Sequence, residues 1–315
     1  MKIAVFGTGA IGGYIGGRLA RAGHDVAFIA RGAHLDAIRV DGLTLREVTN
    51  DDILDEFVVR APATDTPTDI GPVDFVLLGV KAYDTDNAAT QAAPLMGENS
   101  AIVTIQNGLD APERLGNRYG AKRVISGTTS YTATIVAPGI IHRFPPADQV
   151  TVAESTGAAT PRLHAFVDAL KGAGVRGILS EDPMGILWDK FLWIGPVAAI
   201  TAASRATYGD IFNHPPTHAL YLACIDELIA IAAAEGTPIG SDVIAKRKNA
   251  MMTGKVVIKS SLQRDFEKGR PQTEIEELLG TVVRRGARAG VPVPHFGTLY
   301  ATLSLAPKIG YHYAP

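Results

Sequence analysis

Polar side chains that could hold a ligand or move a proton follow two predicted buried strands and open one predicted helix. Lys81 follows the apolar run VDFVLLGV, and Asn107 in Gln106-Asn107-Gly108 follows AIVTI. Lysine desolvates badly and asparagine has a low strand propensity, so ligand binding explains them better than packing does; solvated strand ends are the alternative. Lys190, near the start of the predicted helix 187–204, could supply a proton or hold a carboxylate, although a lone helical lysine is usually solvated.

The N-terminal segment 2–31 reads as strand, glycine turn, helix and second strand, the order of a dinucleotide-binding βαβ unit. Gly7 allows the tight turn, Gly9 lets a pyrophosphate approach the backbone, and Gly12 lets the helix lie close to the sheet. The phosphates would sit on the helix N-terminus, where free N–H groups and the helix dipole favour an anion. A glycine-rich turn without a ligand is the alternative.

The end of the second strand indicates which cofactor is bound. NAD sites usually place Asp or Glu there, whereas this chain has Arg31, with His34 nearby and no carboxylate before Asp36. A guanidinium can hold a 2′-phosphate through two charge-assisted hydrogen bonds, whereas a carboxylate would repel it. NADPH is therefore the expected cofactor, and a solvated loop arginine is the alternative.

Composition agrees with a soluble two-domain enzyme of 315 residues. A formal net charge of −2 argues against a nucleic-acid surface. Cys224 is expected in the core, and a single cysteine suits a reducing compartment. The eight histidines are scattered apart from His214 and His218, and no metal site is expected. The N-terminus forms the first strand rather than a signal peptide, and cytoplasmic is the expected location.

Strand-like and helical runs alternate up to about residue 180, which predicts an α/β fold with a parallel, doubly wound sheet. From 128 onwards a hairpin around Pro138-Gly139 and further strands predict an antiparallel extension of that sheet. After 182 only helical periodicity remains. We expect a nucleotide-binding domain at 1–182 and an all-helical substrate domain at 183–315. The predicted strands are 43–48, 57–60, 73–80, 101–105, 124–125, 149–154 and 177–180, and the predicted helices are 87–96, 111–119, 161–173, 187–204, 218–235, 241–252 and 273–289.

An ordered set of motifs resembles the ketopantoate reductase family. The motifs are GTGAIGGYIG, VKAYDT, IQNGLD, GTTSYTAT followed by Pro138-Gly139, LWDK and SSLQRDFEKGRPQTEIEELLG, and the match runs from Met1 to about Leu305. The resemblance implies a Rossmann domain plus a helical domain and the NADPH-dependent reduction of 2-dehydropantoate to pantoate in pantothenate biosynthesis. The implied partner is a small 2-keto acid, with no nucleic acid or membrane, and a homodimer is a candidate assembly.

The same resemblance assigns roles to single residues. Lys190 matches the catalytic lysine, Glu274 the active-site glutamate and Ser261 a substrate-contacting serine. Arg31 matches the 2′-phosphate anchor. Lys81 and Asn107 match residues at the nicotinamide and substrate, so Asn107 is expected to contact both the cofactor and the substrate. The resemblance also implies cofactor contacts at Ala10 and Ile11 in the glycine turn, and at Ala133 in the GTTSYTAT motif.

This chain departs from the family pattern at several positions. Asparagines that hold the substrate's polar groups in the family are replaced here by Ile194 and Ala198, and a third falls at Tyr208. Residues four apart share a helix face, so the stripe from Lys190 through Ile194 and Ala198 to Thr201 is expected to form an apolar wall. One extra residue, Gln272, lies before Glu274, and Pro196 is expected to kink the helix.

These departures leave other functions open. A reductase or dehydrogenase of a different 2-keto or 2-hydroxy acid is one alternative. A sensor that binds NADP(H) without turnover is another, because a fold does not fix a function.

Overall fold

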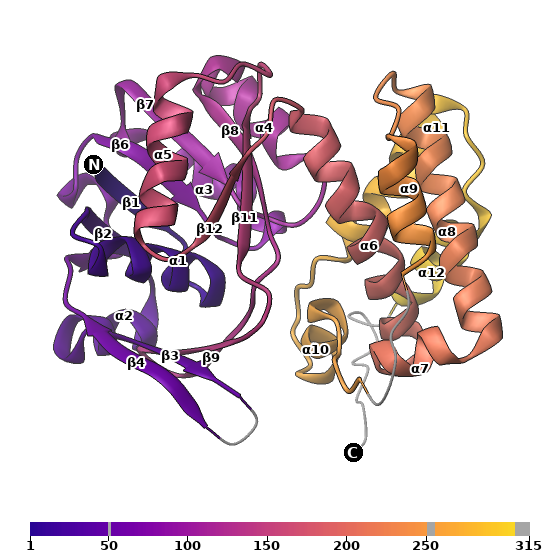
Figure 1. Ribbon diagram of the computed structural model, residues 1–315, viewed down its shortest axis with the longest axis horizontal. Coiled ribbons are helices and arrows are strands. Elements are labelled where there is room, and N and C mark those ends of the chain that lie inside the picture. The colour runs from indigo at the N-terminus through magenta and orange to yellow at the C-terminus, as the bar shows by residue number, and fades with distance from the viewer. Residues whose placement is uncertain (50–51, 251–255, 306–315) are drawn as a thin grey trace. The chain divides into compact units, whose positions relative to one another are not determined.

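The computed structural model describes residues 1–49, 52–250 and 256–305. These residues form two compact units (Figure 1). The first contains 1–106 and 111–186, and the second contains 107–110 and 187 onwards. The chain therefore leaves the first unit after Gln106, returns to it at Ala111, and leaves it again within the first turn of a helix that begins at Pro183.

The first unit is built on a sheet that has eight strands among the described residues, in the order β12-β11-β8-β7-β6-β1-β2-β5. All neighbours pair in parallel except β11 and β8, which are antiparallel, so the predicted antiparallel extension is confirmed for β11. The strands are β1 (Lys2–Phe6), β2 (Asp25–Ile29), β5 (Ala63–Thr64), β6 (Val73–Leu78), β7 (Met96–Thr104), β8 (Val124–Thr129), β11 (Gln149–Glu154) and β12 (Arg176–Leu179).

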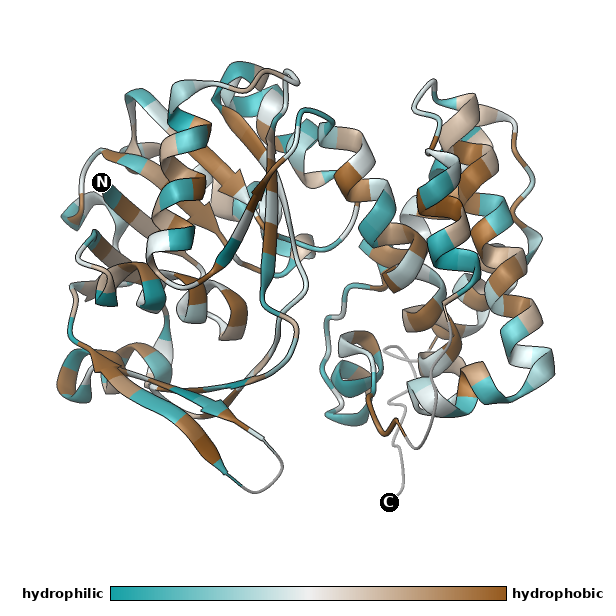
Figure 2. Cartoon of the chain, viewed as in Figure 1, coloured by the Kyte–Doolittle hydropathy of each residue, from teal (hydrophilic) through white to brown (hydrophobic). Residues whose placement is uncertain are grey.

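Helices cover both faces of this sheet, as the α/β prediction requires. Ile3 and Val5 of β1 belong to the apolar core on one face, which α1 (Ala10–Arg21) and α5 (Pro161–Gly172) complete. Ala4 and Phe6 belong to the core on the opposite face, with α3 (Thr85–Gln91) and α4 (Ala111–Tyr119). Because both faces are buried, the central strands are mostly apolar, which Figure 2 shows as brown ribbon.

A second, smaller sheet has the order β4-β3-β10-β9. Its strands are β3 (Leu43–Val48), β4 (Ile53–Val59), β9 (Thr132–Ala137) and β10 (Ile140–Phe144), and α2 (Gly32–Asp41) precedes β3. The predicted hairpin exists, but the expectation that it extends the large sheet was wrong. Leu45 and Ile141 pack instead against Gly17 and Gly13 of α1, which have no side chain to keep this sheet away. Only one face is covered, which explains the alternating burial of β3.

The second unit is helical in its described residues. It comprises most of α6 (Pro183–Ser204), then α7 (Tyr208–Asn213), α8 (Pro215–Ala234), α9 (Ser241–Lys248), α10 (Ser261–Glu267), a π-helical turn η5 (Glu276–Gly280), α11 (Thr281–Ala289) and α12 (Pro294–Leu303). Helix α6 runs through Pro196 as one element. Predicted helix 241–252 ends at Lys248, and its residues 251 and 252 lie outside the described residues.

Two helices of this unit, α6 and α8, are long and apolar enough to cross a membrane by length and composition alone. In the structure, 67% of the apolar window of α6 is buried inside the protein. Helix α8 buries one face, which includes Tyr221 and Cys224, and burial raises the pKa of the Cys224 thiol. The prediction that Cys224 packs in the core is confirmed.

Candidate active site

The glycine turn after β1 has the geometry that each glycine was expected to provide. Gly7 has a φ of +91°, and a Cβ there would lie 2.7 Å from the backbone nitrogen of Val80. A Cβ on Gly12 would lie 2.6 Å from the carbonyl oxygen of Gly7, so only glycine allows α1 to lie this close to the strand. Gly9 is different, because its nearest neighbour would be 4.0 Å away. A glycine with open space beside it leaves room for a ligand to reach the backbone.

The N-terminus of α1 is suited to an anion. Gly9 is its N-cap, no side chain caps it, and its first turn, which contains Ala10 and Ile11, carries no acidic residue. The first backbone N–H groups of a helix have no partner within the helix, and the helix dipole adds positive potential there. These residues therefore fit the pyrophosphate of a dinucleotide.

Arg31 is held in place although it lies on the surface. It is the N-cap residue of α2, directly after the second strand, and its Nη2 donates a 2.9 Å hydrogen bond to Oε1 of Gln91. Gln91 donates in turn to Asn87, at 3.0 Å. His34 has a structural role, because its Nδ1 accepts a 2.9 Å hydrogen bond from the backbone nitrogen of Gly139. His34 is thus bound to the backbone, whereas the guanidinium of Arg31 lies at the surface.

The backbone around Lys81 is braced by Gln106, whose residue type alone did not indicate this role. Nε2 of buried Gln106 donates to the carbonyl oxygen of Val80 at 3.1 Å and to Oγ1 of Thr85 at 2.9 Å. Its Oε1 accepts a 2.9 Å hydrogen bond from Thr104. Gln106 therefore joins the carboxyl ends of β6 and β7 and fixes the turn that carries Lys81. Ala133, the remaining predicted cofactor contact of this unit, lies on β9, which packs against α1.

Lys190 lies in the second turn of α6 and is partly buried. Its neighbour Asp189 is held by Arg247 of α9, whose Nε and Nη2 both lie 2.7 Å from Oδ1. Burial, assisted by the charge of Arg247 and opposed by that of Asp189, lowers the pKa of Lys190 from 10.5 to about 8. A lysine with this pKa exchanges a proton readily near neutral pH.

The stripe along α6 leads from Lys190 to the segment that carries Ser261. Ala198 is buried, and Thr201 donates a 2.8 Å hydrogen bond to the hydroxyl of Ser260, the N-cap residue of α10. Ile194 is partly exposed. Thr201, at the far end of this stripe, thus fixes Ser260, the residue before Ser261.

Trp193 of α6 packs among aromatic rings of the second unit. The ring of Trp193 stacks on Phe212, with centroids 5.4 Å apart and an interplanar angle of 14°. Tyr208, where the family places an asparagine, meets Trp193 edge-on with centroids 6.0 Å apart. Burial raises the pKa of Tyr208 to about 12. Trp193 follows Lys190 by three residues on α6, so this aromatic cluster begins within one helical turn of the lysine.

Glu274 is 3% exposed and lies two residues before the π-helical turn η5. Its carbonyl oxygen accepts a 3.0 Å hydrogen bond from the nitrogen of Leu278. Single π-helical turns often occur at functional sites. The extra residue before Glu274 falls in an exposed turn at Pro271 and Gln272, next to an ion pair of 3.1 Å between Arg270 and Asp265. A surface turn absorbs an insertion with little effect on the buried glutamate.

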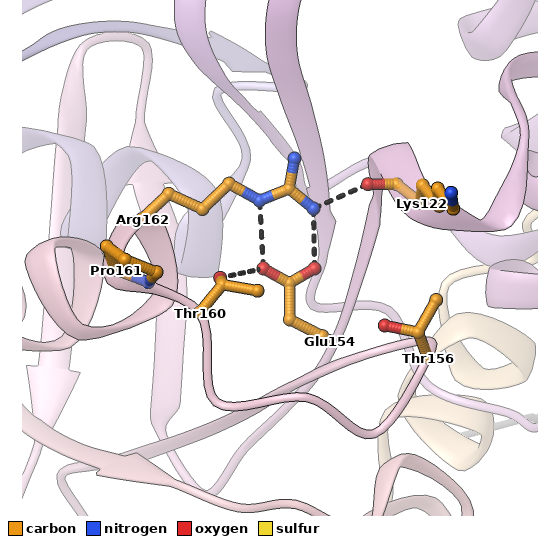
Figure 3. Close-up of a pocket in the computed structure, with 6 residues that line it drawn as sticks. All are labelled: Lys122, Glu154, Thr156, Thr160, Pro161 and Arg162. Carbon is orange, nitrogen blue, oxygen red and sulfur yellow. Dashed lines mark hydrogen bonds and ion pairs between the residues drawn. The ribbon is translucent and has the colours of Figure 1, made fainter.

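A pocket in the first unit contains none of the predicted site residues (Figure 3). In its centre the carboxylate of Glu154, 1% exposed, accepts from Nε and Nη2 of Arg162 at 2.8 and 2.5 Å and from Thr160 at 2.5 Å. Arg162 also donates to the backbone oxygen of Lys122 at 2.6 Å. These contacts fasten the start of α5 to the end of β11, so this cluster is structural. The residues that line the pocket are Lys122, Glu154, Thr156, Thr160, Pro161 and Arg162.

The predicted site residues are divided between the two units. The glycine turn, Arg31, Lys81 and Ala133 lie in the first, whereas Asn107, Lys190, Ser261 and Glu274 lie in the second. Sequence reasoning missed the supporting residues Gln106, Arg247 and Arg285, the last of which pairs with Asp110 at 2.7 Å. Arg285 could have been found from the sequence, because it is an arginine on the otherwise apolar face of the predicted helix 273–289.

Known proteins match this chain over nearly its whole length. The family model "Ketopantoate reductase PanE/ApbA" matches residues 3–157, and its C-terminal counterpart matches 182–306. A 2-dehydropantoate 2-reductase of Mesorhizobium japonicum is 32% identical, with 98% of each chain covered.

Solved structures give the same result. A PanE/ApbA family ketopantoate reductase from Ralstonia eutropha superposes with a TM-score of 0.87 at 28% identity, covering 99% of this chain and 100% of the other. A D-mandelate dehydrogenase with NADH and anilino(oxo)acetate shares the fold, with a TM-score of 0.89 at 20% identity, covering 99% of this chain and 100% of the other. Matches across both units, together with the glycine turn and the motifs that carry Lys190 and Glu274, show that the chain belongs to the ketopantoate reductase family of oxidoreductases.

Proposed function

We propose that this protein reduces a 2-keto acid to the 2-hydroxy acid with NADPH, and that 2-dehydropantoate is the leading substrate. The observation that carries the proposal is Lys190, whose pKa of about 8 allows it to act as a general acid near neutral pH. The family relationship supports both the reaction class and a nicotinamide cofactor. Domains at 1–182 for the cofactor and 183–315 for catalysis are part of the proposal.

Each group of residues has a task in this reaction. When bound, the nicotinamide supplies the hydride. The N-terminus of α1 holds the pyrophosphate, and Arg31 holds the 2′-phosphate. Lys190 donates a proton to the carbonyl oxygen of the substrate as negative charge develops there, and its positive charge stabilises that oxygen in the transition state. Asn107 and Ser261 bind and orient the substrate. Glu274 is the second catalytic residue beside Lys190.

A different substrate is the second candidate, and the residues that follow Lys190 in the chain favour it. Ile194, Ala198 and Tyr208 stand where the family carries amides, and the ring of Trp193 meets Tyr208 edge-on and stacks on Phe212. Such a wall suits a branched or aromatic 2-keto acid better than a hydroxylated one. The D-mandelate dehydrogenase that shares this fold was solved with an aromatic oxo acid.

The test of the proposed function is NADPH oxidation, followed by absorbance, with a panel of 2-keto acids. The panel contains 2-dehydropantoate, 2-ketoisovalerate and phenylpyruvate. Oxidation with at least one member is expected. Tight NADPH binding without oxidation by any member would favour the sensor instead.

Replacing Arg31 by alanine is expected to raise the Michaelis constant for NADPH while leaving that for NADH almost unchanged. A charge-assisted hydrogen bond contributes about 1.5 to 3 kcal/mol, so a selective effect of roughly tenfold or more is expected. The measurement is steady-state kinetics with both cofactors, and Arg39→Ala on the same helix is the control. Equal losses for NADPH and NADH would reject this role for Arg31.

A further inference from the structure

The loop that carries Asn107 belongs to the helical unit although it connects two elements of the first unit. Residues 107–110 follow β7 and precede α4. Gly108 has a φ of +104°, and a Cβ there would lie 3.4 Å from the carbonyl oxygen of Glu277 in the turn η5. The loop backbone therefore lies against the segment that also carries Glu274, three residues before Glu277.

Asp110 anchors this loop through both carboxylate oxygens. Its Oδ1 accepts from Nε and Nη2 of Arg285, at 3.1 and 2.7 Å, and its Oδ2 accepts from Oγ1 of Thr281 at 2.8 Å. Both partners lie on α11, directly after η5. The loop and the segment that contains Glu274 are thus held on one helix.

The electrostatics strengthen this anchor. The Arg285 side chain is only 7% exposed, and its Nη1 also pairs with Glu235 at 2.6 Å. Burial would raise the pKa of Asp110, but the hydrogen bonds and charge of Arg285 outweigh it and lower the pKa. Asp110 is therefore ionised at neutral pH, and charge-assisted hydrogen bonds of this kind are about twice as strong as neutral ones.

We propose that Asp110, held by Arg285 and Thr281, is a positioning residue that sets Asn107 for the substrate. This inference rests on the proposed reductase function. An ordinary surface loop would not need a buried guanidinium, and small displacements of a substrate-binding group are costly, since about 1 Å can lower the rate by about 10²-fold.

The test compares two variants that each remove one carboxylate from the same arginine. In Asp110→Ala the loop loses its anchor while Arg285 keeps Glu235, and in Glu235→Ala the loop keeps its anchor while Arg285 keeps Asp110. We expect Asp110→Ala to lower kcat for the best keto acid by up to about 10²-fold, with a small change in the KM for NADPH, and Glu235→Ala to retain kcat. Asp110→Asn can still accept from Arg285 and is expected to restore most of the activity.

Two further measurements separate positioning from a loss of fold. If Asp110 acts through Asn107, then Asp110→Ala has no additional effect in an Asn107→Ala background, because the two losses are not additive. The melting temperatures of Asp110→Ala and Glu235→Ala are expected to be similar. Additive losses, or equal kcat in the two single variants, would overturn the proposal.

Hydrogen exchange keeps the result separate from the proposed function. Backbone amides of 107–110 are expected to exchange faster in Asp110→Ala than in Glu235→Ala, measured by mass spectrometry. If the wild-type protein reduces no 2-keto acid, the proposed function fails, and the exchange comparison still decides whether Asp110 anchors the loop. Equal exchange in the two variants would overturn the anchoring role.

Discussion

Lys190→Ala is expected to lower turnover by about 10²- to 10⁴-fold, the contribution that a general acid typically makes. Binding of NADPH is expected to change little, because the glycine turn and Arg31 belong to the other unit. The measurements are kcat with saturating keto acid and the Kd of NADPH by fluorescence titration. Near wild-type turnover in this variant would remove Lys190 from the mechanism.

Lys190→Met is the control for folding. Burial disfavours the ammonium of Lys190, so replacing it by an apolar side chain of similar length is expected to raise the melting temperature at pH 7 while activity is lost.

The lowered pKa of Lys190 also determines how the stability of the folded protein changes with pH. Between about 8 and 10.5 the folded protein binds fewer protons than the unfolded chain, so the contribution of Lys190 to stability increases with pH in this range.

The pH dependence of catalysis offers a further check on the same lysine. Keto acid reduction needs protonated Lys190, so kcat is expected to be level below about pH 8 and to fall above it. Oxidation of the hydroxy acid needs the neutral amine and is expected to rise over the same interval. The same pH profile in both directions would contradict proton transfer by Lys190.

The second large effect concerns substrate discrimination. A site built to hydrogen-bond a substrate hydroxyl rejects analogues that lack it by about 10⁴- to 10⁵-fold, whereas an apolar pocket rejects an added hydroxyl by only about 10²-fold. With Ile194 and Ala198 on the helix that carries Lys190, we expect weak discrimination between 2-dehydropantoate and 2-ketoisovalerate. The measurement is the ratio of the two kcat/KM values.

Placing asparagine at these two positions tests the cause. Ile194→Asn combined with Ala198→Asn is expected to shift the kcat/KM ratio toward 2-dehydropantoate, because the amides can pair with its hydroxyl. Ala203→Asn, at an exposed position on the same helix, is the matched control. A wild-type preference for 2-dehydropantoate of several orders of magnitude would show that other residues hold the hydroxyl, and the proposed role of this helix face would be wrong.

Local sequence was sufficient for those features that depend on neighbouring residues. The first βαβ unit is one, because its strand, glycine turn, helix and second strand follow one another within residues 2–31. The buried strands of the large sheet and the long apolar helices α6 and α8 also follow from hydropathy and length. Chemistry-bearing residues such as Lys81 and Asn107 could be selected because their types do not suit the ends of buried strands.

Features that depend on distant pairings required the tertiary structure. The hairpin of β9 and β10 could have joined either sheet, and it pairs with β3 because the glycine face of α1 admits a second sheet there. The partners of Asp110 lie about half the chain away, at Thr281 and Arg285. The pKa of Lys190 is likewise set by burial and by Arg247 on another helix. Such contacts leave no periodic signal in the sequence, because their geometry exists only after the separate elements have packed.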